Sequence, residues 1–295
     1  MLSNQDLHEK ILYPVVRVRS GQGGGSGVLV HSAEDPDNPG EFINVALTCQ
    51  HVVDSSIKMR DEWDPVLKRQ RKTDYFEEVI IEVFDYQNSR LVSSNATQAD
   101  IIAYDKYHDL AAVKLHNPHK MNYIADVISK SDIKDLRLFD DVTTCGCSLL
   151  HDPFGNHGTV TSLREVIEQK AYIMANAAAI FGNSGGGLFS SNNGNLLGLT
   201  SRVTVTQLGF GMDVQTWMNF STHPDRLYEF FDHQELQFIA DPNDSYGAAK
   251  ERRERRRKDA LRDMLWTPKE EGGMAEEAPT GDPAGDSTPP PPESL

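Results

Sequence analysis

A single serine stands among glycines in the segment FGNSGGGLFS, residues 181–190. A serine hydroxyl is a weak nucleophile until a base takes its proton, and histidine suits that role near neutral pH. A glycine–serine linker would have a similar composition, but Val- and Leu-rich stretches typical of strands lie close to this segment. Ser184 is therefore a candidate nucleophile, provided that the chain supplies a base.

The chain has 10 histidines, so their sequence context must select the base. His51 lies at the end of an apolar stretch in VALTCQHVVD, where a side chain would emerge from a sheet. Asp109 precedes another apolar stretch in YDKYHDLAAVKL and is the candidate carboxylate that would fix the tautomer of the histidine. Asp105 and His108 lie close by and compete for these roles. A serine, a histidine and a carboxylate that meet in space can transfer an acyl group.

The glycines around Ser184 also have a chemical interpretation. Gly182 can adopt backbone angles that a residue with a Cβ resists. That freedom would turn the N–H groups of Gly182 and Ser184 toward one point, where they would form an oxyanion hole for a tetrahedral intermediate. This chemistry requires no cofactor and no metal, and we expect neither.

The elements that must position these residues are predicted to be strands. Short Val- and Ile-rich stretches, bounded by Gly, Pro, Asn or Asp, run from residue 11 to 115 and again from 141 to 214. Residues 117–129 resemble a linker between the two sets. Many short strands separated by turns favour an all-β sandwich or barrel.

The character of the chain changes after the second set of strands. Apolar residues at helical spacing predict a helix over residues 224–240, packed on the body. Between residues 250 and 263, eight basic and four acidic side chains give a net charge of +4 and predict an exposed helix. The segment after residue 267 is rich in Pro, Gly and acidic residues and is predicted to be disordered.

Composition excludes several classes of protein. The formal net charge of −15 argues against wholesale binding of nucleic acid, although the Arg-rich segment 250–262 is a candidate site for nucleic acid or another partner. The cysteine count of 3 fits a reducing compartment and packed thiols at Cys145 and Cys147. No signal peptide or membrane span is recognisable, so we expect a cytoplasmic or intracellular protein, with a phage or viral origin also open.

Six segments, in order, resemble a trypsin-fold serine protease of the Deg/HtrA type. They are GSGVLV (25–30), LTCQHVVD (47–54), HDLAAVKL (108–115), DPFGNHGTVTSL (152–163), NAAAIFGNSGGGL (176–188) and LGFGMDV (208–214). The resemblance implies two antiparallel six-stranded Greek-key barrels with the active site between them. It implies His51 as general base, Asp109 as its orienting acid, Ser184 as nucleophile, and Gly182 and Ser184 as the oxyanion hole.

The resemblance also implies a division of the chain and a range of partners. The barrels would occupy residues 1–118 and 119–222, a helix residues 223–245, and the charged helix and tail residues 246–295. The substrates would be proteins or peptides, and trimers are common among Deg relatives. We expect no PDZ domain after the barrels, because the residues that follow them are predicted to form a helix, a charged segment and a disordered tail. The family's Asn-Pro before the first glycine is Ile180-Phe181 here, its proline after GNSGG is Gly187, and its Asp is Asn176.

The specificity pocket follows from the same resemblance. The residue six positions before the nucleophile is Ala178, and Thr200 and Ser201 would form another wall. Without an acidic residue at the base, the pocket is predicted to accept small or medium aliphatic side chains at the cleaved position. The alternative hypothesis is a catalytically silent protease fold, acting as a binding module or as an adaptor recruited through the Arg-rich segment.

Overall fold

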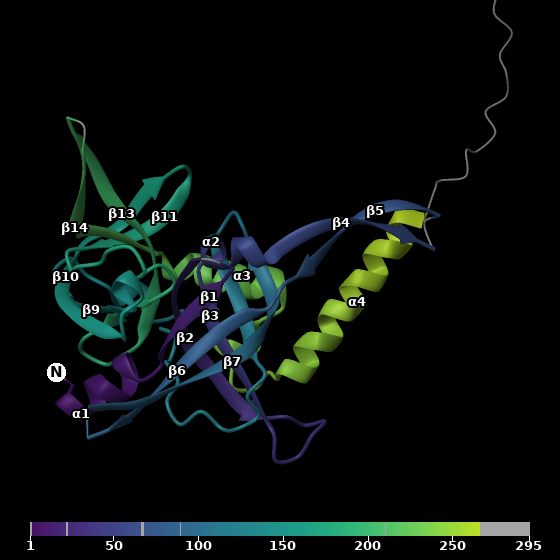
Figure 1. Ribbon diagram of the computed structural model, residues 1–295, viewed down its shortest axis with the longest axis horizontal. Helices are drawn as coiled ribbons and strands as arrows, with labels where there is room; N and C mark the ends of the chain where they lie inside the picture. The colour runs from purple at the N-terminus through teal and green to yellow at the C-terminus, as the bar shows by residue number, and fades with distance from the viewer. Residues whose placement is uncertain (1, 22, 66–67, 89, 210, 266–295) are drawn as a thin grey trace, which may run out of the picture.

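A computed structural model describes residues 2–21, 23–65, 68–88, 90–209 and 211–265. Its described part contains two closed antiparallel barrels of six strands, shown in Figure 1. The first consists of β1 (Val15–Ser20), β2 (Gly23–Glu34), β3 (Phe42–Thr48), β6 (Val79–Gln87), β7 (Arg90–Asp105) and β8 (Leu110–Leu115). The second consists of β9 (Asp141–Gly146), β10 (Phe154–Ile167), β11 (Lys170–Ala175), β12 (Gly187–Ser190), β13 (Leu196–Leu208) and β14 (Gly211–Thr222). The predicted all-β fold of two six-stranded barrels is confirmed.

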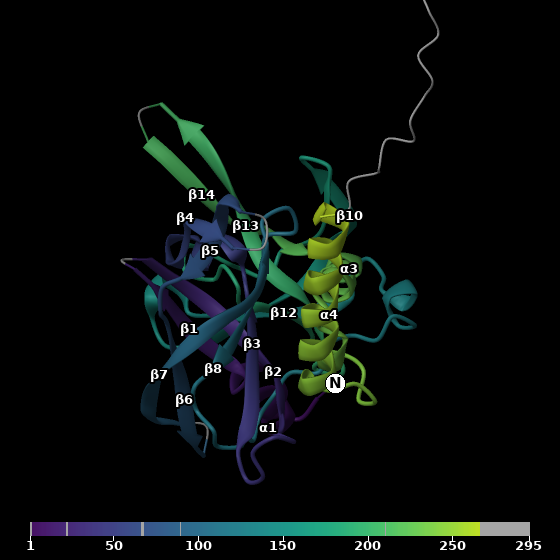
Figure 2. The same cartoon turned by 90° about the vertical axis from the view of Figure 1, so that its right-hand side faces the viewer.

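The two barrels share one strand order. Around each barrel, the first three strands in sequence are followed by the sixth, the fifth and the fourth. The long β13–β14 hairpin projects from the second barrel in both views (Figures 1 and 2). The division predicted after residue 118 falls in the segment between β8 and β9.

The first strand begins later than its sequence predicts. Residues Asn4–Leu7 form α1, and a π-helical turn over His8–Leu12 follows it. β1 starts directly after Pro14, which has no N–H to donate to a sheet. The apolar residues at 11 and 12 therefore belong to a helical turn rather than to the strand.

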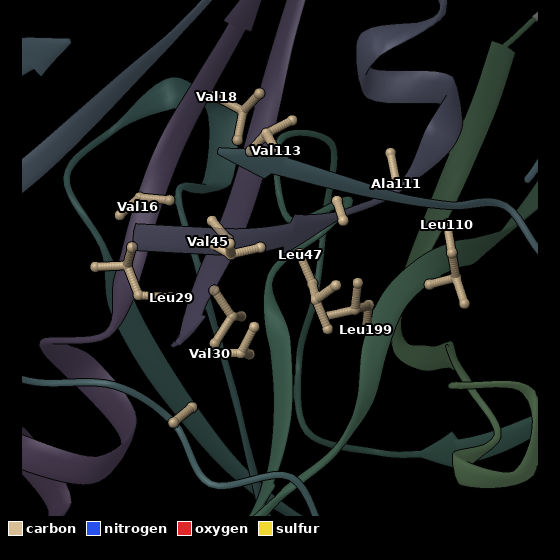
Figure 3. Close-up of a cluster of buried hydrophobic side chains, with 14 of the residues drawn as sticks. Val16, Val18, Leu29, Val30, Val45, Leu47, Leu110, Ala111, Val113 and Leu199 are labelled. Carbon is tan, nitrogen blue, oxygen red and sulfur yellow. The ribbon is translucent and has the colours of Figure 1, made fainter. Parts of the chain in front are cut away.

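Apolar side chains from several strands of the first barrel converge on one core, shown in Figure 3. Val16, Leu29, Val45 and Leu47 are buried there, and Leu199 of β13 packs into the same cluster from the second barrel. Burying a leucine side chain contributes about 1.5–3 kcal/mol. The two barrels are therefore joined through apolar packing as well as through the chain.

A polar hairpin, β4 (Ile57–Asp64) with β5 (Arg69–Phe76), lies outside both barrels. Most of its side chains are exposed, including Met59 and Trp63. Because neither face is buried against a core, the alternation that reveals a half-buried strand is missing from its sequence. The sequence reasoning did not find this hairpin.

Helix α3 (Pro224–Gln234) packs on the body, as predicted, but ends earlier than residue 240. His223 caps its start by accepting a hydrogen bond from the N–H of Asp225, and Pro224 occupies the first turn. Phe230 and Phe231 are buried in the core of the first barrel. Glu235 is left-handed and stops the helix, so the apolar residues beyond it belong to a separate 3₁₀ turn over Gln237–Ile239.

Helix α4 (Tyr246–Leu265) forms over the charged segment but is not simply a solvated helix. Arg252 pairs with Glu235 at 2.9 Å and with Asp244 at 2.5 Å. Arg253 donates to the carbonyl of Ile102, 3.1 Å away. These contacts dock one face of α4 on the body, and the contact with Arg252 lowers the pKa of the Asp244 carboxyl.

The predicted disordered tail after residue 267 lies outside the described residues. Within the described part, the chain beyond the second barrel consists of α3, α4 and short connections. None of the helices described combines the length and apolar character that crossing a bilayer requires.

The docking of α4 predicts unequal effects of two arginine substitutions on this helix. Arg252→Ala removes the arginine partner of the largely buried Asp244 carboxylate and one of the two arginine partners of Glu235, which keeps Arg256. It should lower the free energy of unfolding by about 1–2 kcal/mol. Arg262→Ala removes only an exposed pair with Asp259 and should cost less than about 0.5 kcal/mol. Urea unfolding followed by circular dichroism measures both, and equal losses would contradict the docking.

Candidate active site

His51 and Asp109 meet at the edge of the first barrel. His51 lies on α2 (Gln50–Val53), a single helical turn that begins just after β3 ends. Asp109 closes the turn before β8. The Nδ1 atom of His51 lies 2.9 Å from both carboxylate oxygens of Asp109, and the backbone N–H of His51 donates to Oδ1 at 3.0 Å. The side chain of His51 is 47% exposed, so its ring is accessible.

The carboxylate of Asp109 is held in its charged form. Ser201 Oγ donates to Asp109 Oδ2 at 2.6 Å. Burial acts to raise the pKa of this carboxyl, but the hydrogen bonds from His51 and Ser201 outweigh it, and the pKa is lowered. Asp109 itself adopts a positive φ of 57°, an unfavourable conformation for a residue with a Cβ. The surrounding contacts therefore fix an otherwise uncommon backbone geometry.

The competing residues of the same turn form a separate pair. His108 is buried, with Nδ1 at 2.8 Å from Asp105 Oδ2. Its other ring nitrogen lies 3.0 Å from Glu229 Oε2 on α3. The structure thus groups Asp109 with His51, and Asp105 with His108.

Backbone hydrogen bonds hold the loop that carries Ser184 between the two barrels. The N–H of Ser26 on β2 donates to the carbonyl of Ser184 at 2.8 Å, and the N–H of Gly185 donates to Thr200 on β13, also at 2.8 Å. Gly185 has a φ of 84°, and a Cβ there would lie 2.1 Å from the Ser26 carbonyl. The second glycine of the motif is therefore required by close approach of the two barrels.

The glycine before the serine orients a peptide bond. Gly182 has a φ of 93°, and the carbonyl of Phe181 accepts a hydrogen bond from the N–H of Leu149 at 2.7 Å. In a trans peptide, the N–H of Gly182 points away from that carbonyl. Among the described residues, the N–H groups of Gly182 and Ser184 donate no intramolecular hydrogen bond. Both donors are therefore free to bind an oxygen from outside the chain.

His51 and Ser184 line the same cleft, which has a volume of about 490 Å³. Its other lining residues are Ile180, Phe181, Thr200, Ser201, Arg202, Val203 and Val205. Within the described residues, no hydrogen bond joins the ring of His51 to the Ser184 hydroxyl. Such contacts are often long in enzymes without substrate.

The structure places the predicted pocket residues differently. Thr200 and Ser201 line the cleft, whereas Ala178 is not among its lining residues, and its carbonyl accepts hydrogen bonds from Thr144 and Asn156. The interaction of Ser201 with Asp109 was not foreseen, because the two lie 92 residues apart.

Arg202, Val203 and Val205 are cleft residues that sequence reasoning missed. They continue β13 beyond Ser201, and this continuation of the strand is the signal that could have found them. Arg202 pairs with Glu168 at 2.6 Å and lies over the ring of Tyr172. The charge of this arginine is thus balanced at the rim of the cleft.

The three cysteines are free and buried. Burial raises the pKa of the Cys49, Cys145 and Cys147 thiols, so all three are protonated at neutral pH. Cys49 lies beside His51 and Asp109, but it is fully buried and is not among the residues that line the cleft, whereas Ser184 is. This agrees with the prediction of packed thiols at Cys145 and Cys147.

Comparisons with known proteins agree with this architecture. Residues 25–199 match a protein family that is described as "Trypsin-like peptidase domain". A search of curated proteins found no significant match. Among solved structures, the HtrA-type protease AlgW with a tripeptide is 18% identical, with a TM-score of 0.53 over 81% of this chain and 64% of that chain. Deg5 is 19% identical, with a TM-score of 0.52 over 77% and 90%.

The positive φ at Gly182 predicts the effect of an added methyl group. Gly182→Ala and Gly40→Ala both place a Cβ in a left-handed conformation, which costs about 1–2 kcal/mol. A Cβ at residue 182 also lies 2.6 Å from the Cys147 carbonyl, whereas no atom lies within 4 Å of one at residue 40. The free energy of unfolding, measured with urea, should therefore fall by about 1–3 kcal/mol more in Gly182→Ala than in Gly40→Ala. Indistinguishable midpoints would show that the loop is not packed as described.

Proposed function

Because the chain belongs to the trypsin-like peptidase domain family, we propose that it is a serine endopeptidase. Ser184 is the nucleophile, His51 the general base and Asp109 the acid that orients the histidine. The observation that carries the proposal is a cleft shared by Ser184 and His51, with His51 Nδ1 held 2.9 Å from the Asp109 carboxylate. The chain spans 64% of the AlgW structure, so that protein's full activity is not implied.

Acylation begins at the Ser184 hydroxyl. Nε2 of His51 takes the proton as Oγ attacks the carbonyl carbon of the substrate. Because Nδ1 faces the Asp109 carboxylate, its proton is hydrogen-bonded there, which leaves Nε2 unprotonated and able to accept. The negative charge of Asp109 then stabilises the imidazolium that forms. Ser201 supports this step by fixing Asp109 through its hydroxyl.

The tetrahedral intermediate carries a negative oxygen that needs donors. The N–H groups of Gly182 and Ser184, which have no partner within the described part of the chain, would bind it. His51 gives its proton to the leaving amine, the peptide bond breaks, and an ester forms on Ser184. Water, deprotonated by His51, then attacks this ester, and the second product leaves.

The walls of the cleft suggest which side chain precedes the cleaved bond. Ile180, Phe181, Val203 and Val205 supply an apolar part of the lining, and Arg202, the only Lys or Arg among the lining residues, is paired with Glu168. We infer a preference for small or medium aliphatic residues at the cleaved position. An apolar pocket disfavours a charged side chain, because burial removes its hydration.

A fluorescent fluorophosphonate tests the nucleophile. The wild-type protein should become labelled, while Ser184→Ala should not react and His51→Ala should react at least about 10³-fold more slowly. Ser190→Ala, which changes a serine of β12 outside the cleft lining, is the matched control and should label normally. Labelling that persists in Ser184→Ala would refute the assignment.

A library of peptides that differ only in the residue before the scissile bond tests the specificity. Cleavage after Ala, Val, Ile or Leu should be favoured over cleavage after Lys or Glu by about tenfold or more in kcat/KM, since each apolar group contributes about 1–3 kcal/mol. Preferential cleavage after Lys would overturn the inferred apolar pocket, whatever the result with the fluorophosphonate.

One observation favours a second candidate, an adaptor with a protease fold. The body engages Arg252 and Arg253, but Arg257 is exposed and lines a cavity of about 290 Å³ together with Trp63 and Arg71 of the β4–β5 hairpin. Glu62 and Asp64 line the same cavity, and Asp64 pairs with Arg71 at 3.8 Å. Arg257 and the exposed ring of Trp63 are therefore the groups that would contact an anionic partner such as nucleic acid. A folded wild-type protein that never reacts with the fluorophosphonate would favour this candidate.

A further inference from the structure

A cluster of titratable side chains lies where the turn between β7 and β8 meets α3. Asp105 is the last residue of β7, and His108 follows within the turn. Glu229 and His233 lie four residues apart on α3 and therefore face the same side of the helix. The ring centroids of His108 and His233 are 5.7 Å apart. The cluster thus joins two imidazoles and two carboxylates from distant parts of the chain.

Both ring nitrogens of His108 face carboxylate oxygens. Its Nδ1 lies 2.8 Å from Asp105 Oδ2 and its Nε2 lies 3.0 Å from Glu229 Oε2. A neutral imidazole has one N–H, so only one of these contacts can be a hydrogen bond from the ring. The guanidinium of the nearby Arg226 donates to the main-chain carbonyls of Ala171 and His108 rather than to these carboxylates. Either a second proton or a metal ion would complete the cluster.

The donor set fits a metal ion. Asp105, His108 and His233 each offer one ligand atom, and these three atoms lie within 4.8 Å of one another. Bonds of about 2.0–2.2 Å to a tetrahedral zinc ion hold ligand atoms about 3.3–3.6 Å apart, so the exposed His233 ring must rotate toward the other two ligands to close the site. Two imidazoles and one carboxylate suit Zn²⁺ rather than Mg²⁺ or Ca²⁺, which prefer oxygen ligands.

We propose that Asp105, His108 and His233 form a Zn²⁺ site. His108 binds through Nδ1, and its Nε2–H donates to Glu229, which holds the ring as outer carboxylates commonly do in zinc sites. The sequence predicts no metal, because the ligands are 128 residues apart and match no short motif. A solvent molecule completes the four-coordinate shell.

The site has a consequence for the cleft that rests on the proposed function. His108 directly precedes Asp109, whose backbone has a positive φ. An ion that ties the turn to α3 would hold Asp109 against His51. Zinc would then act as a positioning element for the reaction, without touching the substrate.

Zinc binding can be measured on the full chain after removal of metal with a chelator. Titration against a chromophoric zinc indicator should show one equivalent bound by the wild type. His233→Ala, at an exposed position, should weaken binding by about tenfold or more. His116→Ala is the matched control, because His116 is also an exposed histidine and lies 3.0 Å from one carboxylate, that of Asp100, away from the proposed site. It should bind like the wild type.

A second variant separates this site from the other cluster of metal-binding side chains, Cys49, His51 and Asp109. His51→Ala should retain the bound zinc. Loss of zinc in His51→Ala, retention in His233→Ala, or no binding by the wild type would each overturn the proposal.

The rate of fluorophosphonate labelling then tests the consequence for Asp109. Zinc should accelerate labelling of the wild type several-fold and leave His233→Ala unchanged. A protein that binds zinc through His233 but never reacts would contradict the proposed peptidase while supporting the metal site. Equal labelling rates with and without bound zinc would refute the positioning role.

Discussion

The arrangement of the cleft depends on one buried serine at the seam between the barrels. Ser26 of β2 donates its N–H to the carbonyl of Ser184 and its hydroxyl to the carbonyl of Gly182, at 2.8 and 2.7 Å. The same hydroxyl accepts from the N–H of Cys147, and its carbonyl accepts from Thr48. A fully satisfied polar group in a buried seam permits little displacement, because any shift would leave buried donors or acceptors unpaired. The first barrel thereby fixes the loop that the second barrel carries.

This seam explains why the glycines of the motif are needed. Residue 185 must approach the Ser26 carbonyl more closely than a Cβ allows. Residue 182 must adopt a φ of 93°, and the carbonyl before it, that of Phe181, is held by the N–H of Leu149. His51 and Asp109 belong to the first barrel, and the hydroxyl of Ser201 in the second barrel donates to Asp109 across the seam. Each barrel thus donates a hydrogen bond to a candidate catalytic residue of the other barrel. Relative movement of the barrels would therefore disturb all three candidate catalytic residues together.

Local sequence patterns were enough to predict the strands and the segments that carry the candidate catalytic residues. Strands with one buried face indicated an all-β chain in two halves, and the resemblance to a known family implied the two barrels. The same resemblance covers the short segments that contain His51, Asp109 and Ser184. The sequence could not predict the β4–β5 hairpin, because both its faces are largely exposed and no alternation results. It also missed contacts between residues far apart in the chain, such as Ser201 with Asp109, Arg252 with Glu235 across a helix end, and Asp105 and His108 with His233. These depend on how the elements pack, which periodicity does not record.

A crystal structure of the protein after reaction with a fluorophosphonate would test the central claim most directly. Phosphorus should be bonded to Ser184 Oγ, with the phosphonate oxygen about 2.7–3.1 Å from the nitrogens of both Gly182 and Ser184. His51 should remain paired with Asp109. An adduct on another residue, or a phosphonate oxygen turned toward solvent while the N–H of Gly182 points elsewhere, would contradict the central claim.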